Sequence, residues 1–228
     1  ALLCAVEAAN RAVYARMQEL GGGNIGCTLA IAAVEANKTL YIANVGDSRI
    51  YLSRGTKLTQ LSHDHVNRRG ELMRVIGVLP QMKGDVGFYV NTDDETVANE
   101  RGYDGLPLKK GDSVLVCSDG LVKASPQGQP YTTEQEIVDV LRKKEGDNAA
   151  KTLVSYALGR NADDNVTAAI IQTYDPSRRN RERLIWRGVM AGLAALAVVA
   201  FIAVLGMFQT QGQLGSVAQA ATLNVANL

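Results

Sequence analysis

The sequence predicts an α+β protein built on antiparallel β-sheet. Short apolar segments bounded by turn residues fill residues 27–61, two amphipathic segments of helical period follow within residues 133–159, and one more apolar segment comes after them. Strands and helices do not alternate, so the βαβ units of a parallel sheet are not indicated. A chain of 228 residues is long enough for one substantial core and additional segments.

Residues 1–20 predict the first helix. They are rich in Ala, Leu, Glu, Arg and Met, which are strong helix formers, and the apolar side chains that share one face are Leu3, Val6, Val13, Met17 and Leu20. Gly21-Gly22-Gly23-Asn24 ends this helix. The helical pattern begins at the first residue without a basic leader, so we expect no signal peptide and a chain that begins partway through a domain.

The β-region begins with alternating strands and turns. We predict strands over residues 27–34, 39–45, 49–53 and 57–61, and their close spacing indicates consecutive antiparallel hairpins. The acidic residues 85–102 are expected to form a strand followed by an exposed loop. The apolar run Val114–Cys117 predicts a buried central strand.

Two helices and a last strand complete the expected domain. Thr133-Glu134-Gln135-Glu136 has the pattern of a capping box and begins one helix. Asp147 or Asn148 is expected to cap a second helix that ends at Gly159, residues 166–173 form the last strand, and Pro176 closes the domain.

Composition narrows the class of protein. A net charge of +1 gives no overall signature of a nucleic-acid-binding protein. Cys4, Cys27 and Cys117 are odd in number and lie in apolar surroundings, which predicts buried free thiols in a reducing compartment.

Three aspartates are the candidate site. Asp119 follows the central strand, Asp47 follows the strand over 39–45, and Asp164 precedes the last strand. In an antiparallel sheet the end of one strand lies beside the start of its neighbour, so these carboxylates can meet at one edge. Clustered carboxylates need a cation, and oxygen ligands favour Mg²⁺, Mn²⁺ or Ca²⁺.

Two local patterns have more than one interpretation. Asp119 taken alone is more often an ordinary residue of a strand-to-turn junction. The cluster Ser62-His63-Asp64-His65 could bind a metal or act as acid and base, but a hydrogen-bonded loop is the favoured interpretation. No Cys or His spacing indicates a zinc site.

Residues 189–208 predict a transmembrane helix. The segment Val189–Phe208 has no charged residue and is about the length that crosses a bilayer. Five arginines and Trp186 lie within the basic segment 176–188 before it, and no Lys or Arg lies in the tail 209–228, which places the folded domain, residues 1–175, in the cytoplasm. A buried helix of a soluble core, or nucleic-acid binding by the arginines, is less consistent with this pattern. Gly188 and Gly192 have the small-xxx-small spacing that can allow two such helices to dimerise.

The ordered motifs resemble the metal-dependent type 2C Ser/Thr protein phosphatase family, in its bacterial, membrane-anchored form. The resemblance covers roughly residues 1–174 and is carried by Gly26-Cys27-Thr28, Ala43 to Arg49, Leu58-Thr59 with Asp64-His65, Arg74 to Gly77, Leu108 to Asp112, Cys117 to Leu121, and Asp164 to Thr167. Each motif is weak alone, but the set in this order is specific.

The resemblance implies an α-β-β-α sandwich of two stacked antiparallel sheets. It also implies a centre of two or three Mg²⁺ or Mn²⁺ ions, with Asp119 and Asp164 as ligands of the catalytic pair and Asp47 at a third, weaker ion. The implied activity is hydrolysis of phosphoserine or phosphothreonine in protein substrates by a metal-activated water, and the implied partner is a cognate kinase. No substrate-binding residue is assigned.

The chain departs from the family pattern in two places. It contains no Asp-Gly-x-Gly-Gly motif and no early arginine beside an acidic pair, and its segment between His65 and Arg74 is short. We therefore expect an inactive fragment of a membrane-anchored phosphatase. Two alternatives are a non-catalytic phosphatase-like sensor and a metal-binding interaction module of a membrane signalling system.

Overall fold

The computed structural model describes residues 1–22, 26–36, 38–144, 146–173 and Met190. The chain divides into two compact units, Ala1–Tyr174 and Asp175–Leu228, and the fold described below is that of the first. The predicted basic segment 176–188, the span Val189–Phe208 apart from Met190, and the tail lie outside the described residues. Among the residues that are described, no helix is both long and apolar enough to cross a bilayer.

Two antiparallel sheets form the centre of the first unit. One has the order β1-β2-β5, and the other has the order β4-β3-β6-β7. The strands of the first sheet are β1 (Leu29–Val34), β2 (Thr39–Val45) and β5 (Leu106–Pro107), and those of the second are β3 (Arg49–Arg54), β4 (Lys57–Gln60), β6 (Ser113–Cys117) and β7 (Ala168–Gln172).

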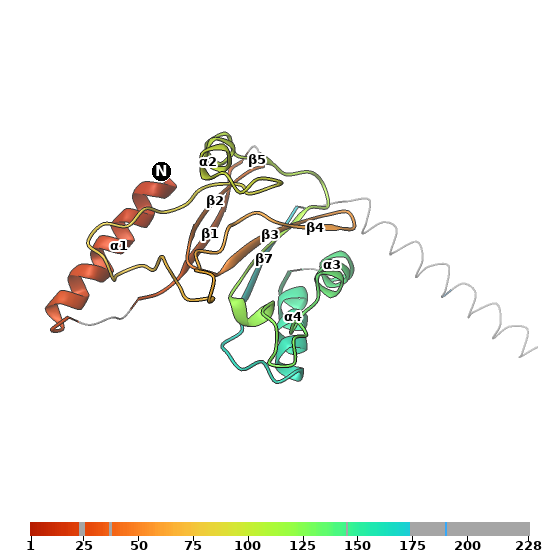
Figure 1. Cartoon of the computed structure of the whole chain (residues 1–228). Helices are drawn as coiled ribbons and strands as arrows, with labels where there is room; N and C mark the ends of the chain where they lie inside the picture. Colours follow the sequence, from red (N-terminus) through yellow and green to blue (C-terminus); the bar gives the residue numbers. More distant parts are fainter. Residues whose placement is uncertain (23–25, 37, 145, 174–189, 191–228) are drawn as a thin grey trace, which may run out of the picture. The chain divides into compact units, whose positions relative to one another are not determined.

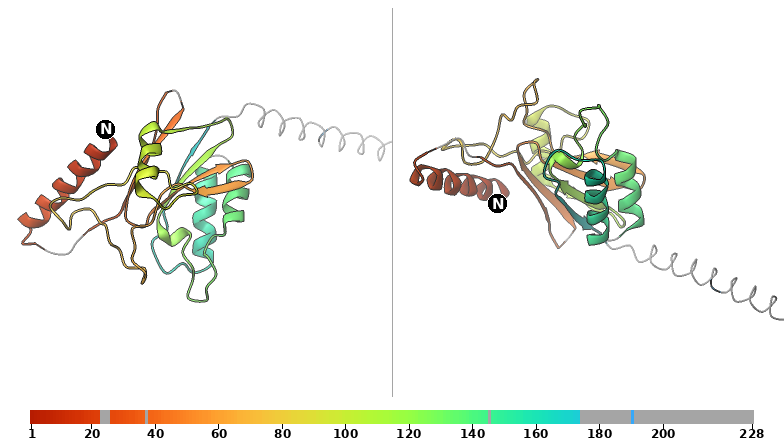
Figure 2. Two further views of the ribbon diagram at one scale, coloured as in Figure 1. Left: turned by 45° about the horizontal axis from the view of Figure 1, so that its top comes forward. Right: turned by 90° about the horizontal axis from the view of Figure 1, so that it is seen from below.

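Helices cover the outer face of each sheet. The first sheet has α1 (Leu2–Glu19) on its outer side, and the second has α3 (Glu134–Lys143) and α4 (Gly146–Gly159) on its outer side (Figure 1). Figure 2 shows the two sheets between α1 and the α3–α4 pair. This arrangement confirms the predicted α-β-β-α sandwich for the described residues.

Apolar side chains fill the three interlayer spaces. Between the sheets, Leu40 and Ile42 of β2 pack with Ile50 of β3 and Val114 of β6. Under α1, Val6 packs with Val45 of β2. On the α3–α4 side the cluster comprises Leu115, Leu121, Ile137, Leu141 and Leu153, among others. Burying several side chains of this size stabilises each layer by about 1.5–3 kcal/mol per residue.

The expected chain of consecutive hairpins needs correction. β1 pairs with β2, and β3 pairs with β4, but β3 does not pair with β2; its other neighbour is β6. The turn Gly46-Asp47-Ser48 therefore carries the chain from one sheet to the other. The inward face of β2 and that of β3 both bury apolar side chains in the same core, which a single continuous sheet would not allow.

Three further expectations are wrong. The segment expected to be an exposed loop contains the helix α2 (Glu95–Asp104), whose first turn is capped by Asp94. Leu20 is 63% exposed, so it is not part of the buried face of α1. Cys4 and Cys27 are exposed, and only Cys117 is the buried thiol that its apolar surroundings predicted.

Candidate metal centre

The sheet register brings the three predicted aspartates to one edge. Arg49, the first residue of β3, pairs with Cys117, the last residue of β6, and Cys117 also pairs with Ala168, the first residue of β7. Asp47 lies just before β3, Asp119 just after β6, and Asp164 in the loop before β7. The same end of the same sheet therefore carries all three.

Ser118 fixes the Asp119 turn to the Asp164 loop. Its hydroxyl donates to the carbonyl oxygen of Asn165 at 3.0 Å and accepts from the Thr167 N–H at 3.0 Å. The Ser118 N–H also donates to the Thr167 carbonyl oxygen at 3.1 Å. These bonds continue the β6–β7 ladder beyond its last strand pair, so the two acidic segments are held at a fixed separation.

The ammonium group of Lys123 lies among the carboxylates of this edge. Its Nζ is 3.0 Å from Asp164 Oδ2, 3.0 Å from Asp163 Oδ1 and 4.0 Å from Asp119 Oδ2. The hydrogen bond from Lys123 is the main reason that the pKa values of Asp163 and Asp164 lie below the ordinary value. The Lys123 ammonium thus lies near the carboxylates of both Asp119 and Asp164.

The negative charge of Asp47 is less fully balanced by nearby cations than the charges of Asp163 and Asp164. Burial raises the pKa of its carboxyl group, and the negative charge of Asp119 raises it further. Arg49 is the nearby cation that lowers it, but the Arg49 guanidinium is committed to Asp64, with Nη2 to Oδ2 at 2.7 Å and Nε to Oδ2 at 2.8 Å. Negative charge therefore exceeds positive charge between Asp47 and Asp119, and an added cation would be stabilised there.

The carboxylate oxygens of this edge suit Mg²⁺ or Mn²⁺ by ligand type but not by the number of side chains grouped together. The three aspartates offer hard carboxylate oxygens, which suit these ions. Within the described ranges, however, no group of three or more Asp, Glu, His or Cys side chains is arranged so that it could hold a metal ion. The described residues therefore do not form a complete coordination shell.

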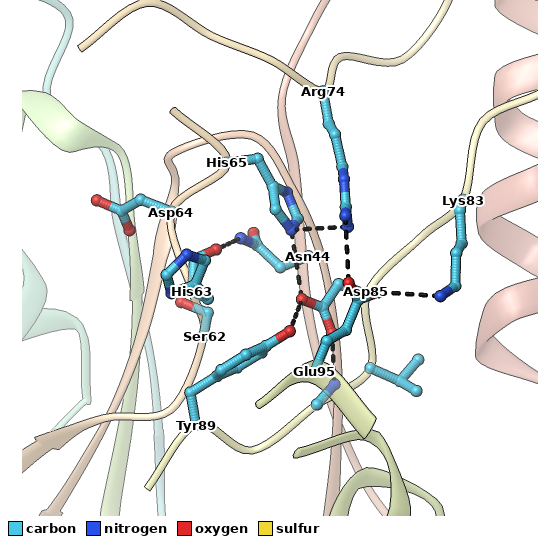
Figure 3. A network of polar contacts seen from close by, with 12 residues as sticks. Asn44, Ser62, His63, Asp64, His65, Arg74, Lys83, Asp85, Tyr89 and Glu95 are labelled. Carbon is cyan, nitrogen blue, oxygen red and sulfur yellow. Dashed lines mark hydrogen bonds and ion pairs between the residues drawn. The ribbon is translucent and has the colours of Figure 1, made fainter. Parts of the chain in front are cut away.

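Figure 3 shows a network of polar contacts around His65, and His65 also contacts Gly46, the residue before Asp47. His65 Nδ1 accepts from the Gly46 N–H at 3.1 Å, and the His65 backbone N–H donates to the Gly46 carbonyl oxygen at 3.0 Å. Since Nδ1 accepts, Nε2 is the ring nitrogen that donates, and it lies 3.3 Å from Asp85 Oδ2. His65 thus positions the backbone next to Asp47.

Asp85 and Arg74 complete the network. Burial disfavours the charge of Asp85, but hydrogen bonds from His65, from the Tyr89 hydroxyl at 2.6 Å and from the Gly87 N–H outweigh it, so the pKa of Asp85 lies below its ordinary value. Arg74 Nη1 lies 3.3 Å from His65 Nε2, but both atoms are donors, and the guanidinium is bonded to Glu95 instead, at 3.4 Å.

The hydrogen-bonded loop is the correct interpretation of residues 62–65. Asp64 is paired with Arg49, His65 is bound to Gly46, and the Ser62 hydroxyl accepts from the Ile50 N–H at 3.0 Å. Sequence reasoning did not assign Lys123, Asp163 or Asp85. Asp163 stood next to a candidate ligand, and Lys123 follows Asp119 by four residues, but no local pattern marked Asp85.

Comparisons with known proteins find similarity to protein phosphatases. The family model described as Protein phosphatase 2C matches residues 6–85. A probable protein phosphatase 2C of Arabidopsis thaliana is 30% identical over 187 residues, covering 74% of this chain and 62% of that protein. The solved structure of PppA, a key regulatory component of T6SS in Pseudomonas aeruginosa, has a TM-score of 0.58 at 27% identity, covering 74% of this chain and 66% of PppA.

The chain is similar to proteins of the phosphatase 2C family, whose model matches residues 6–85. A further fold match is the catalytic domain of the serine/threonine protein phosphatase PstP in complex with two manganese ions, with a TM-score of 0.59 at 24% identity and coverage of 76% of this chain and 70% of that domain. The chain spans about three fifths of the length of the Arabidopsis phosphatase. In this chain, the predicted aspartates occupy one sheet edge together with Lys123.

Proposed function

We propose that the chain is part of a metal-dependent protein-serine/threonine phosphatase that acts on phosphorylated proteins. The observation that carries the proposal is the excess of negative charge between Asp47 and Asp119, at the sheet edge where Asp164 also lies. Asp119 and Asp164 would hold the catalytic Mg²⁺ or Mn²⁺ ions, and Asp47 a further one. When bound, such ions acidify water and neutralise charge on phosphoryl oxygens.

The chain's own residues contribute by holding these oxygens in place. Ser118 fixes the Asp119 turn against the Asp164 loop, and His65 fixes the backbone before Asp47. Such support limits the reorganisation needed when substrate and metal arrive, which is the usual role of groups behind a metal ligand. A kinase that phosphorylates the same proteins is the expected functional partner.

A second candidate function is a non-catalytic, phosphatase-like signalling module. Two observations favour it: the described residues supply no complete metal-holding group, and Lys123 already neutralises part of the carboxylate set. A sensor or scaffold needs the fold and its surface but no hydrolytic centre.

We also propose that the protein is anchored in the cell membrane by Val189–Phe208, with the phosphatase domain in the cytoplasm. The support is the uncharged length of that segment and the arginines confined to its N-terminal side. Anchoring would bring the phosphatase near kinases and substrates at the membrane.

Metal binding by the full chain tests the phosphatase proposal. We expect calorimetry to show Mn²⁺ binding that is weakened by about tenfold or more in Asp119→Asn and in Asp164→Asn, because each variant loses a charged ligand. Asp139→Asn, on the outer surface of α3, is the control and should bind Mn²⁺ as the unsubstituted chain does. Unchanged affinity in both site variants would remove the ligand assignment.

Activity distinguishes the two candidate functions. We expect the 228-residue chain alone to hydrolyse an aryl phosphate negligibly, because its described residues leave the coordination shell open. Fusion to an Asp-Gly-x-Gly-Gly segment of a phosphatase 2C relative should give Mn²⁺-dependent turnover that Asp119→Asn abolishes. If the fused protein folds and binds Mn²⁺ but has no turnover, the signalling-module function is favoured.

A further inference from the structure

Lys123 is placed so that it joins two acidic segments that are far apart in the sequence. Its ammonium contacts Asp164 and Asp163 at 3.0 Å each and Asp119 at 4.0 Å. The hydrogen bond to Asp164 spans 41 residues of chain. One cation therefore balances the turn after β6 and the loop before β7 at the same time.

The backbone of Lys123 is fixed on this edge. Its N–H donates to the Asp119 carbonyl oxygen at 2.8 Å, and its own carbonyl oxygen accepts from the Tyr131 N–H at 3.1 Å. The side chain is 29% exposed. By contrast, Lys143 on α3 is 73% exposed, and among the described residues its carboxylate partner is Asp139, at 3.6 Å. Lys123 is thus held in position in a way that an ordinary surface lysine is not.

We propose that Lys123 is an internal counter-cation that stabilises the metal-free centre and competes with a divalent ion for Asp119 and Asp164. The competition rests on the proposed function, whereas the stabilisation does not. A divalent ion bound by both carboxylates would occupy the region that the ammonium now neutralises, and two cations at such a distance repel each other. Metal binding then requires the exchange of one cation for another, so Lys123 lowers metal affinity.

Lys123→Met tests both parts, because methionine keeps an unbranched apolar stem and removes the charge. In the metal-free full chain we expect the Tm of Lys123→Met to fall by about 2–4 °C. This difference should shrink in about 1 M KCl, where charges are screened within a few ångströms. Lys123→Arg, which keeps the charge, should retain most of the Tm. Lys143→Met is the matched control and should leave both Tm and metal affinity unchanged.

The Mn²⁺ affinity, measured from the free Mn²⁺ signal in electron paramagnetic resonance, gives the second readout. We expect Lys123→Met to bind Mn²⁺ about tenfold more tightly than the unsubstituted chain. Equal or weaker binding would overturn the competition, and an unchanged metal-free Tm would overturn the stabilising role. If neither chain binds Mn²⁺, the metal assignment of the proposed function fails together with the competition, while the Tm comparison still decides the stabilising role.

Discussion

Glu136 serves two purposes in α3. Its carboxylate accepts from the Thr133 N–H at 2.9 Å, and the Thr133 hydroxyl accepts from the Glu136 N–H at 3.2 Å, which confirms the predicted capping box. The same carboxylate accepts from Arg160, just beyond α4. The hydrogen bond from Arg160 is the main cause that lowers the pKa of Glu136 to about 2. A residue that begins one helix therefore also ties it to the end of the next.

The depressed pKa predicts a dependence of stability on pH. A carboxyl group whose pKa falls on folding stabilises the folded state above its ordinary pKa of 4.5, and this contribution is lost as the pH falls from 4.5 towards 2. We expect Glu136→Gln, which keeps the cap, to lower the free energy of unfolding at pH 7 by about 0.5–1 kcal/mol, given the exposure of the pair.

The measurement is urea unfolding at pH 7 and at several values below 4.5. The difference between the unsubstituted chain and Glu136→Gln should narrow as the pH falls. Glu134→Gln, at an exposed position of the same first turn, is the control and should leave the pH dependence unchanged. A constant difference between pH 7 and pH 3 would contradict the ion-pair explanation.

At the scale of an element, the turn between β2 and β3 decides where Asp47 lies. Gly46 has φ of +106°, a conformation that side chains disfavour, and a Cβ there would lie 2.4 Å from Thr28 Cγ2. The Thr28 hydroxyl is 2.9 Å from the Ser48 hydroxyl, and His65 contacts the backbone of Gly46. Thr28 and His65 therefore both contact this turn, which carries the chain from one sheet to the other.

Gly46→Ala should lower the free energy of unfolding by about 2–4 kcal/mol, from backbone strain and from the clash with Thr28. Gly55→Ala is the control, because Gly55 also has positive φ, +64°, but has nothing within 4 Å of an added Cβ. Gly55→Ala should lower the free energy of unfolding by less than Gly46→Ala does. Thr28→Ser removes the nearest methyl group and should restore part of the stability of Gly46→Ala. Equal costs at Gly46 and Gly55 in urea unfolding would show that packing around the turn is unimportant.

At the scale of the whole molecule, the proposed membrane anchor makes a separate prediction. We expect the full chain to stay in the membrane fraction after a carbonate wash, and the variant with Leu196→Arg and Val199→Arg to be released. Each arginine at the centre of a span costs about 2.5–3.5 kcal/mol of insertion free energy. Leu214→Arg, in the tail, is the control and should stay in the membrane fraction. Retention of the double variant would rule out the span as the anchor.

Local chemistry was enough to predict most elements of the first unit. β2 runs over the residues that turn signals and apolar pattern indicated, and α3 begins at its capping box. The helix α2 was missed because residues 85–102 are acidic and irregular in pattern, and the helix includes Gly102, a poor helix former. In the fold this glycine allows close packing, since a Cβ there would lie 1.9 Å from the Val86 carbonyl oxygen. The close approach to Val86 explains why a glycine stands at this position of the helix.

The sequence by itself determined that Asp47, Asp119 and Asp164 stand at strand ends, because strand length and turn residues are local properties. Only the tertiary structure decided that β3 leaves the sheet of β2, that Lys123 lies among Asp119, Asp163 and Asp164, and that Asp85 supports His65. The Asp85–His65 contact joins residues 20 positions apart, and the Lys123–Asp164 contact joins residues 41 positions apart. Which residues meet in these contacts depends on how whole layers pack and on the balance of charge at the resulting sheet edge. A short stretch of sequence determines neither of these.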